Sequence, residues 1–201
     1  MTSLSMGAPA APPPAMTEES MPGYRGMWIG ISLEFIEFTV FFAVYFTARG
    51  YFPQVFREGA PKLWTLGGLG ITLVMLTSGW MLTRTVAAVR AGRLASARAW
   101  VVAALAVALC YPLLKLLEIE HNRAAGVAAG SNAFFTVYYY LTINHFIHSS
   151  WGIMGMAWVT LRLWMGAYSP GQLKGLESLA IYWHATDLVW IMLFSLFYAF
   201  V

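Results

Sequence analysis

Charged residues are scarce in this chain, and their scarcity argues against most soluble classes of protein. Only 10% of the 201 residues are Asp, Glu, Lys or Arg, whereas soluble domains carry roughly 25%. Hydrophobic residues make up 59% of the chain and aromatic residues 16%. The net charge of +3 is small, so the composition does not indicate nucleic-acid binding. It predicts an integral membrane protein whose length suits one domain.

Cysteine is nearly absent as well, and so are the usual signatures of catalysis. Cys110 is the single cysteine and lies in an apolar run, which excludes a disulfide framework. A Gly-rich phosphate loop, a nucleophile with its base and a set of cysteine metal ligands are all missing. We therefore expect that the chain alone is not an enzyme.

The first 22 residues are rich in Ala, Pro and Ser. They lack the basic start and continuous apolar core of a signal peptide. Such a composition cannot bury enough apolar surface to fold. We expect residues 1–26 to be a disordered cytoplasmic tail and residues 27–201 to be the transmembrane domain.

Five apolar stretches reach the ~20 residues that a membrane-spanning helix needs. Short connections with Gly, Pro or charge separate them, as is typical of loops. The expected fold class is an all-α integral membrane protein, a five-transmembrane-helix bundle. Its helices are expected at residues 27–48, 63–89, 98–119, 133–163 and 176–201.

The distribution of basic residues predicts the orientation. Seven of the 12 Lys and Arg residues fall near the tail and in the connections after the second and fourth spans. They are Arg25, Arg84, Arg90, Arg93, Arg98, Arg162 and Lys174. The positive-inside rule then places the N-terminus in the cytoplasm and, after five spans, the C-terminus in the periplasm.

Two carboxylates lie in the first span. Glu34 and Glu37 are one helical turn apart on one face. Two desolvated carboxylates this close do not both ionise easily, which suits a proton carrier or a protonated hydrogen-bond donor. The alternative, that both are neutral and bonded to neighbouring helices, stays open.

The third span ends in a polar cluster. Pro112 can kink this helix, and Lys115 and Glu118 are spaced to form a pair. We place Glu118, Glu120 and His121 at the outer interface. Glu120 and His121 fit a wetted helix end better than a metal site.

The fourth span carries two histidines, His145 and His148, followed by Gly152 and Gly155. Small residues let another helix approach closely. We therefore expect this face to pack within the bundle, with both histidines turned away from lipid.

The last span carries His184 and Asp187, again one turn apart. An aspartate that accepts a hydrogen bond from a histidine fixes its tautomer and offsets the burial of both groups. Glu34 and His184 lie at similar depth from the inner ends of their helices, so they could share one polar cluster. Glu177 lies nearer the inner interface.

These residues leave three functions open. Three buried histidines allow one bis-histidine haem, although His145 and His148 are too close on one helix to be opposing ligands. The candidates are a helical accessory subunit, a small b-type haem protein that carries electrons, and a proton-coupled transporter. The transporter is disfavoured because no inverted repeat is visible.

The last span resembles the signature of subunit III of the haem-copper respiratory (cytochrome c) oxidases. That signature is Tyr-Trp-His, two residues, Asp and then Val-Trp. It is matched by Tyr182, Trp183, His184, Asp187, Val189 and Trp190. The family's fourth-span spacing is matched by His145, His148 and Gly152. Family glutamates fall at Glu118 and Glu177, and Glu34 takes the place of the carbodiimide-sensitive buried acid.

The resemblance implies a five-helix accessory subunit in a bacterial inner membrane. Similar forms occur in cytochrome c and quinol oxidases and in the nitric-oxide-reductase-associated (NorE-type) branch. The implied partners are catalytic subunit I and subunit II, or nitric oxide reductase subunits. The catalytic subunit would hold the haem and copper, and this chain would hold none, although it could bind phospholipid.

The resemblance also implies roles for individual residues. Glu34 would be the buried acid that supports proton uptake, and Glu37 departs from a family position that is usually apolar. An interhelical polar network would consist of Glu118, His145, His148, Glu177, His184 and Asp187. Close helix packing would involve Gly152, Gly155, Trp183 and Trp190.

Overall fold

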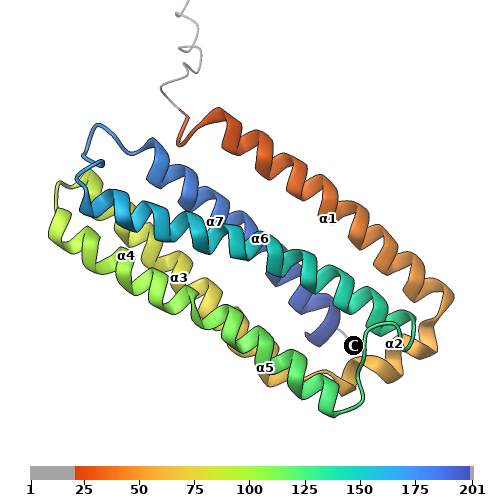
Figure 1. Ribbon diagram of the computed structural model, residues 1–201. Helices are drawn as coiled ribbons and strands as arrows, with labels where there is room; N and C mark the ends of the chain where they lie inside the picture. The colour runs from red at the N-terminus through yellow and green to blue at the C-terminus, as the bar shows by residue number, and fades with distance from the viewer. Residues whose placement is uncertain (1–20, 200–201) are drawn as a thin grey trace, which may run out of the picture.

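The computed structural model describes residues 21–199, and these residues form helices that run side by side (Figure 1). Within this part of the chain, the only β-type pairing is an isolated bridge between Ser169 and Gln172. The helical elements are α1 (Arg25–Tyr51), α2 (Pro53–Gly59), the 3₁₀ turn η1 (Ala60–Lys62), α3 (Thr65–Arg90), α4 (Leu94–Ala108), α5 (Cys110–Ala124), α6 (Ala133–Trp164), α7 (Lys174–Phe194) and the π-helical turn η2 (Ser195–Ala199). The predicted all-α class is confirmed for these residues.

The outer surface of the bundle is apolar. Large side chains such as Ile36, Leu66 and Trp151 are exposed, as suits contact with lipid. Four helical segments are long and apolar enough to cross a membrane. They are Arg25–Tyr51, Thr65–Arg90, Leu94–Ala124 and Lys174–Ala199. The chain thus has the character of a multi-pass membrane protein.

Helix α6 is not among these four segments, although it has 32 residues. Its Tyr, Trp, His, Asn and Ser side chains lower its mean hydropathy. Four of the five predicted spans therefore have the length and hydropathy of a membrane-spanning helix, and the count of five stays a prediction.

The third predicted span is broken into α4 and α5 at Leu109. Pro112 has no N–H to donate to the carbonyl of Ala108, four residues earlier, and its ring crowds that carbonyl. The regular hydrogen-bond pattern is therefore interrupted just before the proline. The combined segment begins and ends several residues outside the predicted 98–119.

Two segments that the sequence places outside the helices are ordered. The connection after α1 contains α2 and η1, because Pro53 suits the first turn of a helix and Phe56 is buried. At the other end, α1 begins at Arg25, so the last two residues of the predicted tail, 25 and 26, belong to the helix. Residues 1–20 and 200–201 lie outside the described residues.

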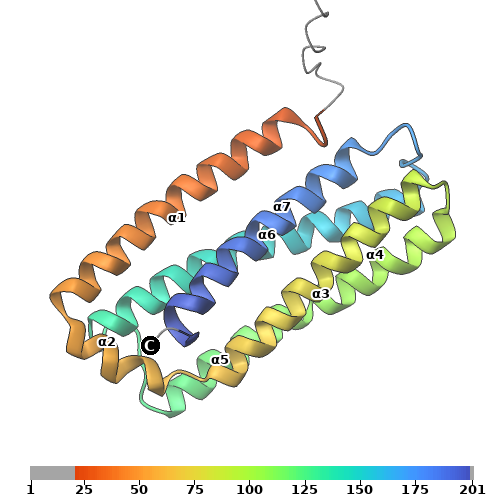
Figure 2. The same cartoon turned by 180° about the vertical axis from the view of Figure 1, so that it is seen from behind.

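Helix α7 lies among the others and contacts α1, α3 and α6 (Figure 2). Helices α4 and α5 cover α3, while α1 runs along the edge of the bundle and packs on α6 and α7. We call the end with the start of α1 and the connection 165–173 the α1-start end. The opposite end, with α2 and the connection 125–132, is the α2 end (Figure 1).

Candidate functional site

A buried ion pair lies on α5. Lys115 Nζ is 2.7 Å from Glu118 Oε2, and both side chains are 0% exposed. Tyr198 in η2 donates to Glu118 Oε1, so both oxygens of the carboxylate accept a hydrogen bond. The sequence placed Glu118 at an outer interface. The structure instead encloses it, because the last turn of the chain closes over this face of α5.

Polar residues without a predicted role extend this ion pair. The hydroxyls of Tyr138 and Tyr198 are 2.9 Å apart, and Asn122 Nδ2 donates to Tyr138 at 3.3 Å. The backbone N–H of Trp64 donates to Asn122 Oδ1 at 3.2 Å. The network therefore joins the start of α3, α5, α6 and η2. One signal that could have found Asn122 is its spacing of four residues from Glu118, which places both on one helix face.

The neighbouring polar residues of α5 do not form a metal site with Glu118. Glu120 pairs with Arg123 at 3.1 Å on the surface. The ring of His121 stacks on Trp64, with 4.9 Å between centroids. Within residues 21–199, no three His, Cys, Asp or Glu side chains gather closely enough to hold a metal ion.

His145 lies in the interior of the bundle and links three helices. Its Nε2 is 3.1 Å from the backbone carbonyl of Thr186 in α7, and its Nδ1 is 3.1 Å from the Tyr111 hydroxyl in α5. A carbonyl can only accept, so Nε2 carries the hydrogen and Nδ1 accepts from the tyrosine. Both ring nitrogens are thus engaged in interhelical hydrogen bonds.

His148 has a different environment from His145. Its Nε2 lies 3.7 Å from Glu37 Oε2 in α1, and the His148 and Glu37 side chains are 24% and 42% exposed. Its Nδ1 is buried without a hydrogen-bond partner among the described residues. The two histidines were expected to look into the bundle together, but only His145 is enclosed and His148 faces α1.

Glu34 is the buried acid of α1, with 5% of the residue exposed. Its Oε1 has no hydrogen-bond partner in the described part of the chain. No hydrogen bond or ion pair between described residues joins Glu34 to His184, so the structure does not form the shared cluster that their similar depth suggested.

His184 and Asp187 contact each other as their spacing suggested. His184 Nδ1 is 3.4 Å from Asp187 Oδ2, and His184 Nε2 is 3.0 Å from the Thr83 hydroxyl of α3. His184 is 46% exposed, whereas Asp187 is 5% exposed. A Cβ at Gly79 of α3 would lie 2.5 Å from Asp187 Oδ2, so only glycine leaves room for the carboxylate there.

Two tryptophans of α7 reach across to α3. Trp183 Nε1 donates to Ser78 Oγ at 3.0 Å, and Trp190 Nε1 donates to Thr72 Oγ1 at 2.8 Å. Both indole N–H groups are therefore satisfied although both rings are buried. The hydroxyl partners on α3 were not predicted from the sequence.

Helix α6 approaches α7 closely at its two glycines. A Cβ at Gly152 would lie 2.7 Å from the ring of Trp183. A Cβ at Gly155 would lie 3.1 Å from Leu179 Cδ1. The small residues thus lie where α7 side chains meet the backbone of α6.

Glu177 joins three elements at the α1-start end. Its Oε1 is 2.7 Å from Arg90 Nη2 at the end of α3, and its Oε2 accepts from the backbone N–H of Gly23 at 3.2 Å. The N–H of Tyr24 donates to Ser178 Oγ at 2.8 Å. The chain leading into α1 is therefore docked on the first turn of α7.

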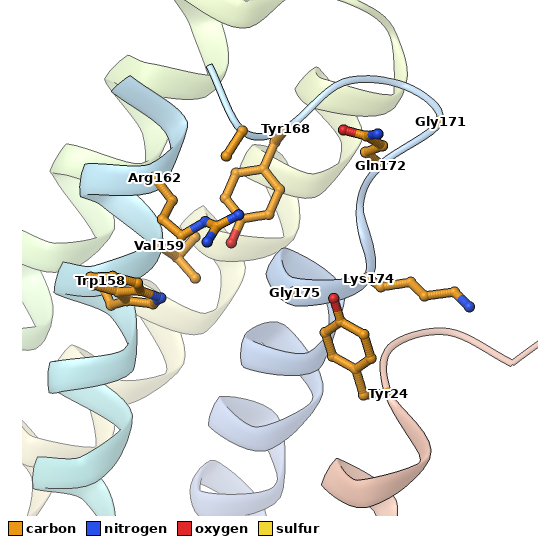
Figure 3. Close-up of a pocket in the computed structure, with 10 residues that line it drawn as sticks. Tyr24, Trp158, Val159, Arg162, Tyr168, Gly171, Gln172, Lys174 and Gly175 are labelled. Atoms are coloured by element: carbon orange, nitrogen blue, oxygen red, sulfur yellow. The ribbon is translucent and has the colours of Figure 1, made fainter. Parts of the chain in front are cut away.

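A cavity of about 500 Å³ opens beside these contacts (Figure 3). Arg162 and Trp158 of α6 line one side, and Lys174 and Tyr24 lie on the other. Burial raises the pKa of the Tyr168 hydroxyl, which also lines this cavity, above its ordinary value. The cavity combines two cationic side chains with aromatic rings at the end of the bundle.

Known proteins resemble the chain over nearly its whole length. Residues 17–201 match the family described as cytochrome c oxidase subunit III. A probable cytochrome c oxidase subunit 3 of Mycobacterium leprae is 29% identical over 175 residues, which cover 86% of this chain and 85% of that protein. The corresponding protein of Mycobacterium tuberculosis is 27% identical over 173 residues, with the same coverage. Quinol oxidase subunit 3 of Bacillus subtilis is 24% identical over 191 residues, covering 92% of this chain and 90% of that protein. The chain belongs to the cytochrome c oxidase subunit III family.

Proposed function

We propose that the chain is a non-catalytic accessory subunit of a haem-copper respiratory oxidase and packs on its catalytic subunit. The observation that carries this proposal is the family match over residues 17–201, together with relatives named as subunit 3 of cytochrome c and quinol oxidases. The side-chain contacts agree with it, because buried polar groups such as Glu118, Asn122 and His145 are engaged in hydrogen bonds between helices. Subunits I and II of such an oxidase, or the subunits of a nitric oxide reductase, are the proposed partners.

We further propose that α6 is a fifth span in a bacterial inner membrane. At a rise of 1.5 Å per residue its 32 residues extend about 48 Å, longer than the hydrocarbon core. It packs along α7, and its His145 side chain is enclosed. The basic residues favour a cytoplasmic N-terminus, which five spans would pair with a periplasmic C-terminus.

The alternative function is a bis-histidine haem protein, and the hydrogen bonds of the histidines disfavour it. Both ring nitrogens of His145 are bonded, and both ring nitrogens of His184 have a partner on Thr83 or Asp187. To ligate iron, His145 would have to give up an interhelical hydrogen bond, and His184 would have to give up its contact with Thr83 or with Asp187. The haem and copper of the complex would then belong to its catalytic subunit.

A reduced-minus-oxidised visible spectrum of the chain purified alone in mild detergent distinguishes the accessory subunit from the haem protein. We expect a featureless spectrum from a folded, helical protein. A sharp b-type band at near-stoichiometric haem would instead identify the chain as an electron carrier.

We also propose that the cavity of Figure 3 holds a phospholipid headgroup. Arg162 and Lys174 would contact the phosphate, while Trp158 and Tyr24 suit the boundary between headgroup and acyl chain. The acyl chain would follow the adjoining apolar groove between α6 and α7, which Trp158 and Tyr24 also line.

A role for Glu34 in proton uptake is proposed from its burial and its unsatisfied oxygen. Glu34→Gln should leave assembly of the oxidase intact and slow turnover at high pH, where protons from bulk water are scarce. The matched control is Glu37→Gln, which removes a half-exposed carboxylate one turn away. Identical pH–activity profiles for the wild-type and Glu34→Gln complexes would contradict the proton role.

A further inference from the structure

Aromatic side chains that can be oxidised follow one another through the interior of the bundle. The ring centroids of Tyr138 in α6 and Tyr198 in η2 are 6.2 Å apart. Trp190 of α7 continues the series, with its centroid 6.5 Å from that of Tyr198 and 6.3 Å from that of Tyr111 in α5. Phenol and indole rings lose a single electron far more readily than phenyl or aliphatic side chains, and rings this close exchange electrons rapidly. The spacing therefore allows an electron to pass between α5, α6, α7 and η2.

This series of rings reaches the outside of the bundle through Tyr139, whose ring centroid is 5.0 Å from that of Tyr138. Tyr139 is only partly buried, and its hydroxyl donates to the backbone carbonyl of Val127 in the connection at the α2 end. At the inner end, Tyr111 is 0% exposed and lies near the start of α5. We call the five rings from Tyr139 to Tyr111 the aromatic path.

Two tyrosines of the aromatic path have a proton acceptor on their hydroxyl group. Tyr198 donates to Glu118 Oε1. The Tyr111 hydroxyl donates to His145 Nδ1 at 3.1 Å, because Nε2 of that ring carries the hydrogen that faces the carbonyl of Thr186. A phenol that loses an electron becomes strongly acidic. A base that is already hydrogen-bonded to the hydroxyl can therefore take the proton without any movement of the chain.

Tyr138 is connected to the same acceptor through Tyr198. The two hydroxyl oxygens are 2.9 Å apart, and Tyr138 is the donor because Tyr198 gives its single hydrogen to Glu118. Lys115 Nζ and Asn122 Nδ2 donate to the Tyr138 oxygen at 3.4 and 3.3 Å. The hydrogen bonds thus run in one direction, from Tyr138 to Tyr198 and on to Glu118.

The Lys115 ammonium selects where a radical would remain. Its Nζ lies 5.2 Å from the ring centroid of Tyr138 and 5.8 Å from that of Trp190. A cation over an aromatic face is attracted by the electron density of the ring, so it disfavours a positive charge on that same ring. Tyr198 and Tyr111 avoid this cost, because each can release its proton and become a neutral radical.

We propose that the aromatic path carries single oxidising equivalents and that Tyr198 and Tyr111 hold the resulting tyrosyl radical. A one-electron oxidant outside the bundle, either an oxygen-centred radical or an oxidised metal complex, takes one electron from Tyr139 and is thereby reduced. Electrons then move outward from ring to ring until Tyr198 has lost one electron. Its O–H bond breaks, and the proton passes to Glu118. At Tyr111 the proton passes to His145 instead. This redox chemistry is independent of the complex that the chain joins.

Photo-oxidation of the purified full chain in mild detergent tests the proposal, with ruthenium tris(bipyridine) as the sensitiser and persulfate as its electron acceptor. We expect electron paramagnetic resonance of the frozen sample to show a neutral tyrosyl radical. The test variant, Tyr111→Phe/Tyr198→Phe, should lose most of this signal. The matched control is Tyr45→Phe. Tyr45 is also buried at the α2 end, but its hydroxyl donates to the backbone carbonyl of Leu196, which cannot take up the proton.

Radical formation in the wild type should also be slower in D₂O than in H₂O, because the proton moves with the electron. If the double variant does not fold, the single variants Tyr111→Phe and Tyr198→Phe replace it, and each should lose part of the signal. Signals of equal size in these variants and the control would overturn the proposal. Equal rates in D₂O and H₂O would overturn the assignment of Glu118 and His145 as proton acceptors.

Discussion

Glu118→Gln is expected to lower the free energy of unfolding by about 3–5 kcal/mol, because it breaks a buried ion pair from one side. The substitution leaves the Lys115 ammonium enclosed without a counter-charge, since both side chains of the pair are 0% exposed. The glutamine amide has only one acceptor oxygen, so it can accept from Tyr198 or from Lys115 but not from both as the carboxylate does. Thermal unfolding of the purified chain in mild detergent measures the effect.

Two further variants show whether buried charge is the cause. Lys115→Met combined with Glu118→Gln removes both charges, so it should recover a large part of the lost stability. Glu120→Gln breaks the exposed pair with Arg123 and should change the unfolding free energy by at most about 1 kcal/mol. If Glu118→Gln unfolds at the temperature of Glu120→Gln, the pair is not an enclosed ionic contact.

Gly152→Val is expected to destabilise the chain by about 1–3 kcal/mol through overpacking. The new Cβ would lie 2.7 Å from the ring of Trp183, and that ring is held in place by its hydrogen bond to Ser78. Either the indole gives up this bond or α6 moves away from α7. Thermal unfolding and the fluorescence of the tryptophans would report the change.

Gly30→Val is the matched control for this variant. Gly30 lies in α1, where an added Cβ would meet nothing within 4 Å. The Gly30→Val variant should therefore unfold at or near the temperature at which the wild-type chain unfolds. Equal destabilisation by the two valines would mean that the loss of helical glycine, rather than the close contact of α6 with α7, causes the effect.

Local features of the sequence predicted much of this fold. The apolar stretches mark four helices that are long and apolar enough to span a membrane, because a membrane helix must satisfy its own backbone and present apolar side chains to lipid. The i,i+3 pairs Lys115–Glu118 and His184–Asp187 were also visible, since their geometry depends on a single helix. The connection after α1 was expected to be a loop. Its helical turn forms because Phe56 packs on Tyr45 and Phe134, which are distant in sequence.

Contacts between helices were much harder to predict. His145 and His148 have similar sequence surroundings, yet one bonds to α5 and α7 while the other faces Glu37 on α1. Glu34 and His184 were expected at similar depth in the bundle, but depth does not determine which neighbour a side chain faces. Hydroxyl partners such as Ser78 carry no distinctive local signal, so they emerge only from the packed structure.

Affinity purification of the tagged chain from its native membranes in mild detergent tests the central claim most directly. The account predicts that a haem-copper catalytic subunit co-purifies in near-equal amount and that its haem absorbance follows the chain through size-exclusion chromatography. A chain that elutes as a folded protein, free of any haem-copper or nitric oxide reductase subunit in membranes where such complexes are intact, would contradict its assignment as an accessory subunit.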